Sequence, residues 1–311
     1  MRKLFLSFAS AVLGFICVNA QQDPMVSQYM FNGLYLNPAY AGSHDYWSST
    51  LSYRSQWVGF DGAPETFIAS ADGPIQGKNM GIGLVAMHDR IGVTRQNTLI
   101  ANYAYQIKTS ATSKFAMGIN AGFSQFSASF SDPEFTVWDK EQDAVYQNDL
   151  NSRILPRFGV GMYYYGKKYY GGFSIPTLFA YQKDMNFSFD LSRATFLRRH
   201  YLLTAGYIFE MSKDIKIKPS LLVKYVKNAP VEADLNLAAV YKDMFWIGAS
   251  YRTNDAVSVI LEYQTNANFR VGYAYDITLT KMRNYSSGSH EIMIGWDFGK
   301  DLVKVKTPRY F

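Results

Sequence analysis

Hydrophobic and polar residues alternate along many short segments between residues 50 and 298. The clearest example is 215–225, with the sequence IKIKPSLLVKY. Because side chains alternate across a β-strand, a period of two predicts a strand whose two faces meet different environments. Its apolar face holds Ile215, Ile217, Leu221, Val223 and Tyr225, and its polar face holds Lys216, Lys218, Ser220 and Lys224.

This pattern predicts fourteen strands separated by turn residues. Many of them are about nine to eleven residues long, the length that crosses an outer membrane at a tilt. A closed sheet would leave no unpaired edge in the bilayer. We therefore predict an all-β fold, a transmembrane antiparallel β-barrel over residues 50–298. The expected strands are 50–57, 65–72, 80–88, 97–107, 114–126, 155–165, 168–175, 199–210, 215–225, 232–241, 244–252, 255–264, 268–277 and 290–298.

The lengths of the connections give a second, independent argument for a barrel. If the first strand rises from the periplasm, connections after odd-numbered strands face outward. The long connections 127–154, 176–198 and 278–289 all belong to this set. Transmembrane barrels have short periplasmic turns and long external loops. A soluble β-sandwich, which stays as the alternative, has no reason to sort its connections in this way.

Two local features refine this picture. Pro219 cannot donate a ladder hydrogen bond, so we expect a bulge or a local irregularity there. Aromatic residues cluster at strand ends, where they would form girdles at the headgroup level, although cross-strand packing would also place rings there. These residues are Tyr53, Trp57, Tyr163, Tyr164, Tyr165, Tyr169, Tyr170, Trp246 and Trp296.

Residues 1–20 have the layout of a signal peptide. Arg2 and Lys3 form the positive end, an apolar stretch covers 4–18, and 18–20 offer a cleavage site with a small final residue. The apolar stretch is shorter than the ~20 residues of a spanning helix, which argues against a membrane anchor. Cys17, the only cysteine, lies inside this signal. The mature chain is therefore expected to contain neither a disulfide nor a catalytic thiol.

Charge and hydropathy argue against two further classes. The net charge is +6, and Arg2 and Lys3 of the signal contribute two of these charges. The remaining excess is not clustered, so no nucleic acid is expected as a partner. Hydrophobic residues make up 48% of the chain, yet no run after the signal approaches 18 apolar residues. Helical membrane spans are therefore not expected.

The sequence offers no arrangement with catalytic spacing, so we expect no enzyme, no cofactor and no metal site. His290 and Glu291 resemble the start of a metalloprotease motif, but Ile294 stands where the second histidine belongs, and the segment alternates as a strand. There is no GxSxG nucleophile elbow. Gly81 and Gly83 lack the final glycine of a nucleotide loop, and glycines in barrel strands mark bends or close approach.

Two charged groups each allow two interpretations. The long segment 127–154 would be either a solvated external loop or a divalent-ion site. Lys216, Lys218 and Lys224 would either line the lumen or bind an acidic partner. The acidic residues of the long segment are Asp132, Glu134, Asp139, Glu141, Asp143 and Asp149.

The segment behind the signal, 23–42, reads DPMVSQYMFNGLYLNPAYAG and resembles the opening signature of the PorP/SprF family. Blocks similar to the family follow in the family's order over nearly the whole mature chain. Any one block is a weak signal, but the ordered set makes coincidence improbable. The further blocks are 52–64 (SYRSQWVGFDGAP), 80–92, 159–178, 198–209, 216–252, 269–276 (FRVGYAYD), 288–295 (GSHEIMIG) and 308–311 (PRYF).

The resemblance implies an integral outer-membrane protein of the type IX secretion and gliding machinery of Bacteroidetes. It favours a general, PorP-like component, associated with the periplasmic lipoprotein ring, over a dedicated partner of one exported adhesin. The implied partners are ring subunits, the C-terminal signal domains of secreted proteins, and outer-membrane lipid. A porin or small-solute channel stays as the alternative, because fourteen strands enclose a lumen of intermediate width.

The segment 21–49 is expected at the periplasmic mouth of the barrel or inside its lumen, and 299–311 as a periplasmic tail. In the first of these, aromatic side chains would contact the barrel wall, and the Asn37-Pro38 pair would fix a turn. The expected partner-binding residues are Tyr29, Phe31, Asn32, Tyr35, Asn37, Pro38 and Tyr40.

Overall fold

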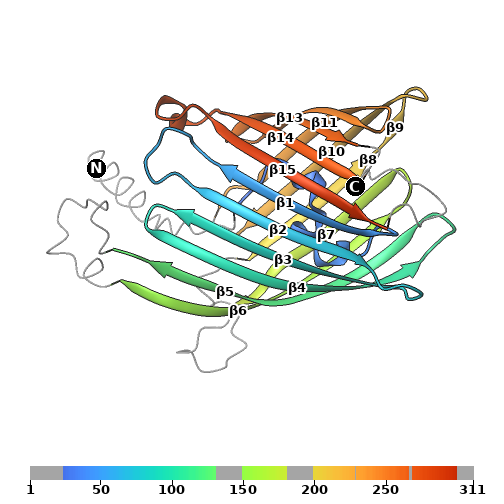
Figure 1. The fold of residues 1–311 in the computed structure, drawn as a ribbon, viewed down its shortest axis with the longest axis horizontal. Helices are drawn as coiled ribbons and strands as arrows, with labels where there is room; N and C mark the ends of the chain where they lie inside the picture. Colours follow the sequence, from blue (N-terminus) through green and yellow to red (C-terminus); the bar gives the residue numbers. More distant parts are fainter. Residues whose placement is uncertain (1–23, 131–148, 181–198, 228, 266–267, 300–311) are drawn as a thin grey trace, which may run out of the picture.

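The computed structural model describes residues 24–130, 149–180, 199–227, 229–265 and 268–299, which form one antiparallel sheet (Figure 1). The expected signal peptide, most of the acidic segment and the tail beyond residue 299 lie outside the described residues. The strands are β1 (Trp47–Ser55), β2 (Glu65–Pro74), β3 (Met80–Ile91), β4 (Thr94–Lys108), β5 (Lys114–Ala128), β6 (Leu150–Tyr165), β7 (Tyr169–Ala180), β8 (His200–Tyr207), β9 (Phe209–Glu210), β10 (Ile215–Val226), β11 (Glu232–Tyr241), β12 (Phe245–Arg252), β13 (Ala256–Gln264), β14 (Phe269–Thr278) and β15 (Ser289–Phe298).

The sheet closes on itself. β15 pairs with β1 from Trp47↔Phe298 to Ser55↔His290, and β10 pairs with β11 on the opposite side of the barrel. β8 and β9 both pair with β10 and follow each other directly, so together they act as one strand. The wall therefore has fourteen antiparallel strands, which confirms the predicted barrel. None of the helices in the described part of the chain is both long and apolar enough to span a membrane.

The break between β8 and β9 lies opposite Pro219. The pairs Ser220↔Gly206 and Ile217↔Phe209 share one register, so no residue is inserted, and only the ladder between them is interrupted. Pro219 has no N–H to donate there. On the other side of this strand, the N–H of Ile208 donates to the carbonyl oxygen of Lys168 at 2.7 Å, so the pairing toward β7 continues past the break. The irregularity predicted at Pro219 is confirmed, but it falls on the neighbouring strand.

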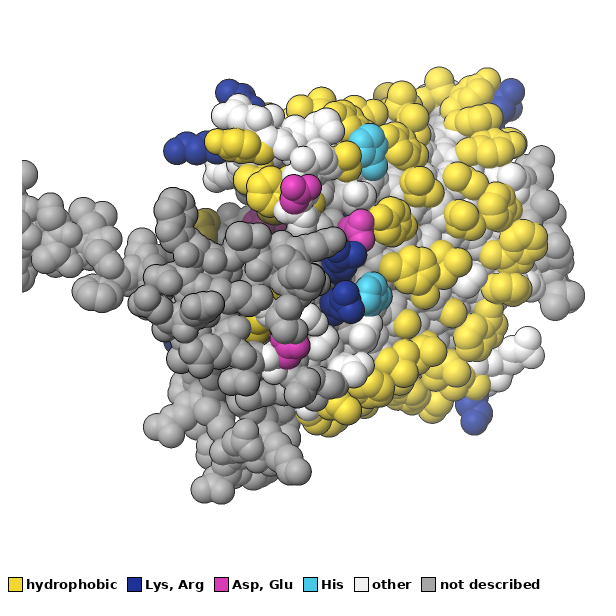
Figure 2. Space-filling view, turned by 60° about the vertical axis from the view of Figure 1, so that its left-hand side comes forward, with side chains coloured by type: hydrophobic (Ala, Val, Ile, Leu, Met, Phe, Trp, Pro, Cys, Tyr) yellow, Lys and Arg dark blue, Asp and Glu magenta, His cyan; other side chains and the backbone are white. Residues whose placement is uncertain are grey.

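The two faces of the wall differ as the alternation predicts. Outward side chains are apolar and exposed, such as Ile119 at 60% and Leu237 at 57%, and Figure 2 shows them gathered in a wide belt. Lipid-facing surfaces of outer-membrane barrels have this character, whereas their interiors are polar. Buried polar side chains that point inward include Thr50, Thr98, Asn120, Arg157, Lys218 and Glu262.

The two ends of the barrel differ in their connections. We call one the short-turn end, where the chain passes through 75–79, 109–113, 166–168, 211–214, 242–244 and 265–268. The other is the long-loop end, which carries 56–64 and 279–288 together with the segments between β5 and β6 and between β7 and β8. The connection expected at 89–96 is reduced to 92–93, because β3 and β4 continue pairing to Ile91↔Thr94.

Three short helices precede β1, and all lie inside the barrel (Figure 1). They are η1 (Tyr29–Phe31), α2 (Gly33–Leu36) and η2 (Pro38–Tyr40), and most of their side chains are buried. A further helix, η3 (Lys281–Asn284), lies in a connection at the long-loop end. We call residues 24–42 the luminal segment.

The apolar belt makes a direct prediction for Ile119. This residue is the middle of the outward apolar row on β5, so its replacement by Arg would place a charge near the centre of the bilayer. Ile119→Arg is expected to destabilise the folded barrel by about 2–4 kcal/mol, as measured by urea unfolding in phospholipid vesicles. Ile107→Arg, next to the end of β4, is the control and should cost about 0–1 kcal/mol. Equal costs would contradict the assignment of the belt.

Candidate functional site

The luminal segment runs through the barrel from one half to the other. Near its start, Ser27 meets Asp276 and Glu291, which lie close to the long-loop ends of β14 and β15. At its end, the N–H of Gly42 donates to Asp72 at the short-turn end of β2, at 2.9 Å. The chain then leaves the lumen and enters β1. The segment therefore extends through the lumen between the two ends of the barrel and is not confined to one mouth.

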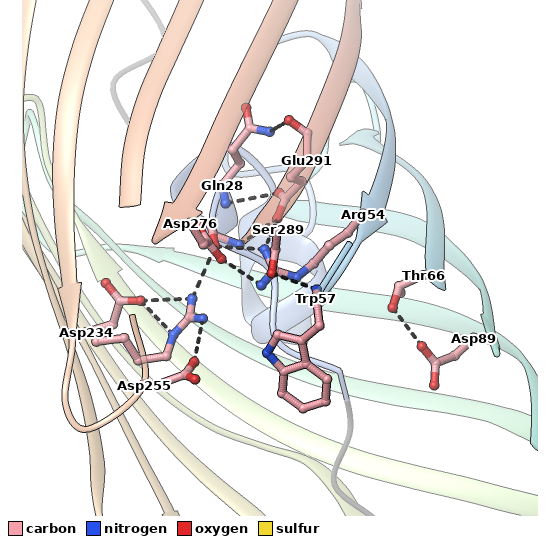
Figure 3. A network of polar contacts seen from close by, with 12 residues as sticks. Gln28, Arg54, Trp57, Thr66, Asp89, Asp234, Asp255, Asp276, Ser289 and Glu291 are labelled. Carbon is pink, nitrogen blue, oxygen red and sulfur yellow. Dashed lines mark hydrogen bonds and ion pairs between the residues drawn. The ribbon is translucent and has the colours of Figure 1, made fainter. Parts of the chain in front are cut away.

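The first attachment is a buried cluster of charges around Arg54, drawn in Figure 3. Arg54 pairs with Asp276 at 2.7 Å and with Glu291 at 3.2 Å, and all three side chains are almost fully buried. Arg54 also donates to the hydroxyl oxygen of Ser27 at 2.9 Å, and that hydroxyl donates to Asp276 at 2.7 Å. One residue of the luminal segment thus joins strands β1 and β14 through charge-assisted hydrogen bonds.

A second buried cation, Arg252 at the end of β12, extends this cluster. It pairs with Asp234 on β11 and with Asp255 in the following connection, both at 3.2 Å. Its guanidinium also lies 3.4 Å from the hydroxyl oxygen of Ser27. The two arginines therefore link five strands, β11, β12, β14, β15 and β1, and converge on the same serine. We call Ser27, Arg54, Asp234, Arg252, Asp255, Asp276 and Glu291 the anchor cluster.

The anchor cluster needs the backbone of the luminal segment. Its carboxylates outnumber its two arginines, and a buried charge is costly unless it is paired and hydrogen-bonded. The N–H groups of Ser27 and Gln28 donate to the two carboxylate oxygens of Glu291, at 2.7 and 3.0 Å. The side-chain amide of Gln28 also donates to the carbonyl oxygen of Glu291 at 3.2 Å. Wall and segment therefore satisfy each other's polar groups.

The second attachment lies around Asn37, in the half nearer the short-turn end. The side chain of Asn37 accepts a hydrogen bond from the N–H of Ala39 at 2.9 Å, and Pro38 opens η2. The predicted Asn37-Pro38 turn is thereby confirmed. The amide of Asn37 also donates to the carbonyl oxygen of Met162 on β6 at 2.9 Å. On β7, the hydroxyl of Ser174 donates to the carbonyl oxygen of Leu36 at 2.6 Å.

Inward-facing glycines make room for the segment. A Cβ atom at Gly118 would overlap the backbone of Ala39, and one at Gly81 would overlap the carbonyl group of Ala41. At Gly161 a Cβ would strike the side chain of Asn37. Glycine in a strand permits such close approach of another backbone. These positions fit the segment to three different strands, β3, β5 and β6.

The predicted partner-binding residues all lie inside the barrel. Phe31 packs edge-on against Trp246, with ring centroids 5.5 Å apart, and Tyr40 packs against Tyr163 at 5.6 Å. The side chains of Tyr29, Phe31, Asn32, Asn37, Pro38 and Tyr40 are buried, and that of Tyr35 is half-buried. Their role in binding a partner stays a prediction.

The three lysines of β10 point into the lumen and each has a local partner. Lys216 pairs with Asp243 at 2.5 Å, and Lys224 pairs with Glu232 at 3.2 Å. Lys218 lies over the rings of Tyr170 and Trp246, with its nitrogen 5.7 and 5.3 Å from their centroids. Of the two interpretations of these lysines, the structure therefore favours the lumen lining.

His290 and Glu291 point to opposite faces of β15. Glu291 faces the lumen and belongs to the anchor cluster, whereas His290 lies on the outer face beside Tyr273, at 2.7 Å. They therefore cannot ligate one ion together.

Sequence reasoning missed the anchor cluster. A signal was present, because Arg54, Asp234, Asp276 and Glu291 are charged residues in segments that otherwise alternate between apolar and small polar residues. Charges at lumen-facing positions are ordinary in barrels, so the pattern could not single them out. The partners of Arg54 lie 222 and 237 residues further along the chain, and only the closed register brings them together.

Removal of one cation tests the anchor cluster. Arg54→Met would leave Asp276 and Glu291 buried without their main counter-charge, so the barrel should lose about 3–5 kcal/mol of unfolding free energy. Denaturant unfolding of the refolded barrel in vesicles measures this loss. The triple variant Arg54→Met, Asp276→Asn, Glu291→Gln should recover part of it. As control, Lys168→Met at an exposed pair with Glu210 should change stability little. A wild-type stability for Arg54→Met would refute the role of the cluster.

Comparison with solved structures finds outer-membrane barrels. A mutant of the monoaromatic hydrocarbon channel TodX is 10% identical, with a TM-score of 0.48, and the match covers 85% of this chain and 92% of that one. The KdgM porin is 12% identical with a TM-score of 0.39, covering 81% and 99%. Omp33 of Acinetobacter baumannii is 7% identical with a TM-score of 0.43, covering 82% and 99%. At these identities the likeness concerns the barrel fold alone.

Comparison with protein families identifies a specific family, which the comparison with solved structures does not. No curated protein matches the chain. The family described as type IX secretion system membrane protein PorP/SprF matches residues 18–296. This range includes the luminal segment and all the strands except the last two residues of β15. Family and fold together make this an integral outer-membrane protein with a role in type IX secretion, and neither is that of a known enzyme family. The chain therefore belongs to the PorP/SprF family of type IX secretion system membrane proteins.

Proposed function

We propose that this protein works by binding, as a plugged barrel that holds other parts of the type IX secretion machinery at the outer membrane. The observation that carries this proposal is the occupied lumen. The luminal segment is hydrogen-bonded to the wall in both halves of the barrel, through Glu291 and Asp276 at one end and Asp72 and Met162 at the other. An interior filled and cross-linked in this way suits an anchor better than a diffusion channel.

The short-turn end supplies the docking surface of this proposal. Its turns carry five exposed lysines. Among the described residues of these turns, one acidic residue, Asp214, is exposed. Lys168 is partly neutralised by its pair with Glu210 at 2.7 Å. Complementary charge steers partners to such a face and fixes their orientation. The partner expected here is an acidic surface of the periplasmic lipoprotein ring. The exposed lysines are Lys78, Lys167, Lys168, Lys213 and Lys242.

Charge reversal tests this docking surface. The variant Lys78→Glu, Lys167→Glu, Lys242→Glu should lose ring subunits on affinity purification from mildly solubilised outer membranes. The matched control reverses three exposed cations at the other end, Lys227→Glu, Lys281→Glu and Arg283→Glu, and should keep them. Equal recovery from both variants would refute the surface. Recovery of one exported protein through its C-terminal signal domain, without ring subunits, would indicate a dedicated cargo partner instead.

Conductance separates this function from a porin. The intact protein should show no steady current in planar bilayers, because the luminal segment occupies the lumen. Deletion of residues 23–42 should create a steady open pore, since fourteen strands enclose more space than their own side chains fill. Heat-modifiable migration on gels confirms that the deleted barrel still folds. The same deletion should abolish type IX secretion in cells. A steady current through the intact protein, or intact secretion by the deletion, would overturn the proposal.

A further inference from the structure

The outer wall carries a hollow within the apolar belt, on strands β2 to β5. It is lined by the exposed side chains of Phe67, Leu99 and Phe123 and by the small side chain of Ala86. Toward the long-loop end it is closed by a polar pair, in which the ring nitrogen Nδ1 of His88 lies 2.6 Å from Oδ1 of Asn97. An apolar hollow with a polar end, on a wall that faces lipid, suits the binding of an acyl chain.

A pair of arginines stands directly beyond this polar end. Arg90 and Arg95 are cross-strand neighbours on β3 and β4, and each lies two residues beyond His88 or Asn97 on the same outward face. Both side chains are exposed. Like charges placed opposite each other in a sheet are destabilising. The pair therefore favours an anion between them.

In the part of the chain that the structure describes, neither arginine of this pair forms an ion pair with a carboxylate. Glu65 is opposite Arg90 in the register of β2 and β3, yet no carboxylate of the described residues lies within 4.0 Å of either guanidinium. Figure 2 shows basic, acidic and histidine side chains together where the apolar belt ends, toward the long-loop side. Arginine in particular binds phosphate through its planar fork of N–H donors.

We propose that this part of the wall binds a phosphorylated glycolipid of the outer leaflet, of the lipid A type. One acyl chain lies in the hollow between Phe67 and Phe123, and a phosphate sits between Arg90 and Arg95. The depth agrees with this assignment, because the arginines are at the long-loop end, which faces outward in outer-membrane barrels. The site is separate from the luminal segment and from the short-turn lysines, so it does not depend on the secretion partners.

Binding of fluorescent lipid A to the purified, folded barrel in detergent tests the site. Arg90→Gln with Arg95→Gln should weaken binding about tenfold or more. Lys281→Gln with Arg283→Gln makes the same charge change at the same end, away from the hollow, and should bind as wild type. Ala86→Phe fills the hollow and should also weaken binding, whereas Ala101→Phe, an outward alanine outside the hollow, should not.

Competition identifies the ligand. Dephosphorylated lipid A and phosphatidylglycerol should both displace the probe poorly, the first because it lacks the phosphates and the second because it lacks the glycolipid headgroup. Equal competition by either lipid would overturn the assignment, and so would wild-type binding by the Arg90, Arg95 double variant. Each variant is first shown to be folded by its heat-modifiable migration, so a loss of binding is not a loss of the barrel.

Discussion

Every peptide group that crosses the bilayer must find its hydrogen-bond partner within the protein, because lipid offers none. In this chain that constraint is met by one sheet, closed between β1 and β15. Closure separates an outer face in contact with lipid from an inner face shielded from it. The strict alternation of apolar and polar residues along each strand is the consequence. Where Pro219 cannot take part in the ladder, a single strand divides into β8 and β9, and the barrel still closes.

Closure also creates a lumen that the wall cannot fill alone. Fourteen strands enclose a space wider than their own inward side chains occupy, and the luminal segment fills it. The fit is polar as well as steric. Glu291 receives two backbone N–H groups of the segment and a guanidinium from β1, so its charge is compensated by both. Buried ion pairs are weak evidence for stability in general. Here they fix which part of the segment meets which strands.

The functional surfaces follow from this division. With the lumen occupied, partners and lipids must meet the protein at its ends and on its outer wall. The short-turn end presents basic turns. Near the long-loop end, the outer wall presents a pair of arginines next to an apolar hollow. Membership of the PorP/SprF family assigns the protein a role in type IX secretion, and the barrel places it in the outer membrane.

The sequence by itself determined the features that depend on near neighbours. Period-two alternation located all fourteen strands, because side-chain direction is a local property. The sorting of connection lengths, the interruption at Pro219 and the turn at Asn37-Pro38 were equally readable. The family blocks, too, are contiguous in the chain.

Only the tertiary structure decided how the lumen is occupied. Gly118 meets Ala39, and Arg54 meets Glu291, across long stretches of chain whose relative position is set by the register of the whole barrel. The same holds for the direction of the luminal segment, which begins in the long-loop half of the lumen and ends at the short-turn end. Alternation tells which residues point inward, but it carries no information about which inward residues face each other. That pairing depends on closure of the sheet, a property of all the strands together.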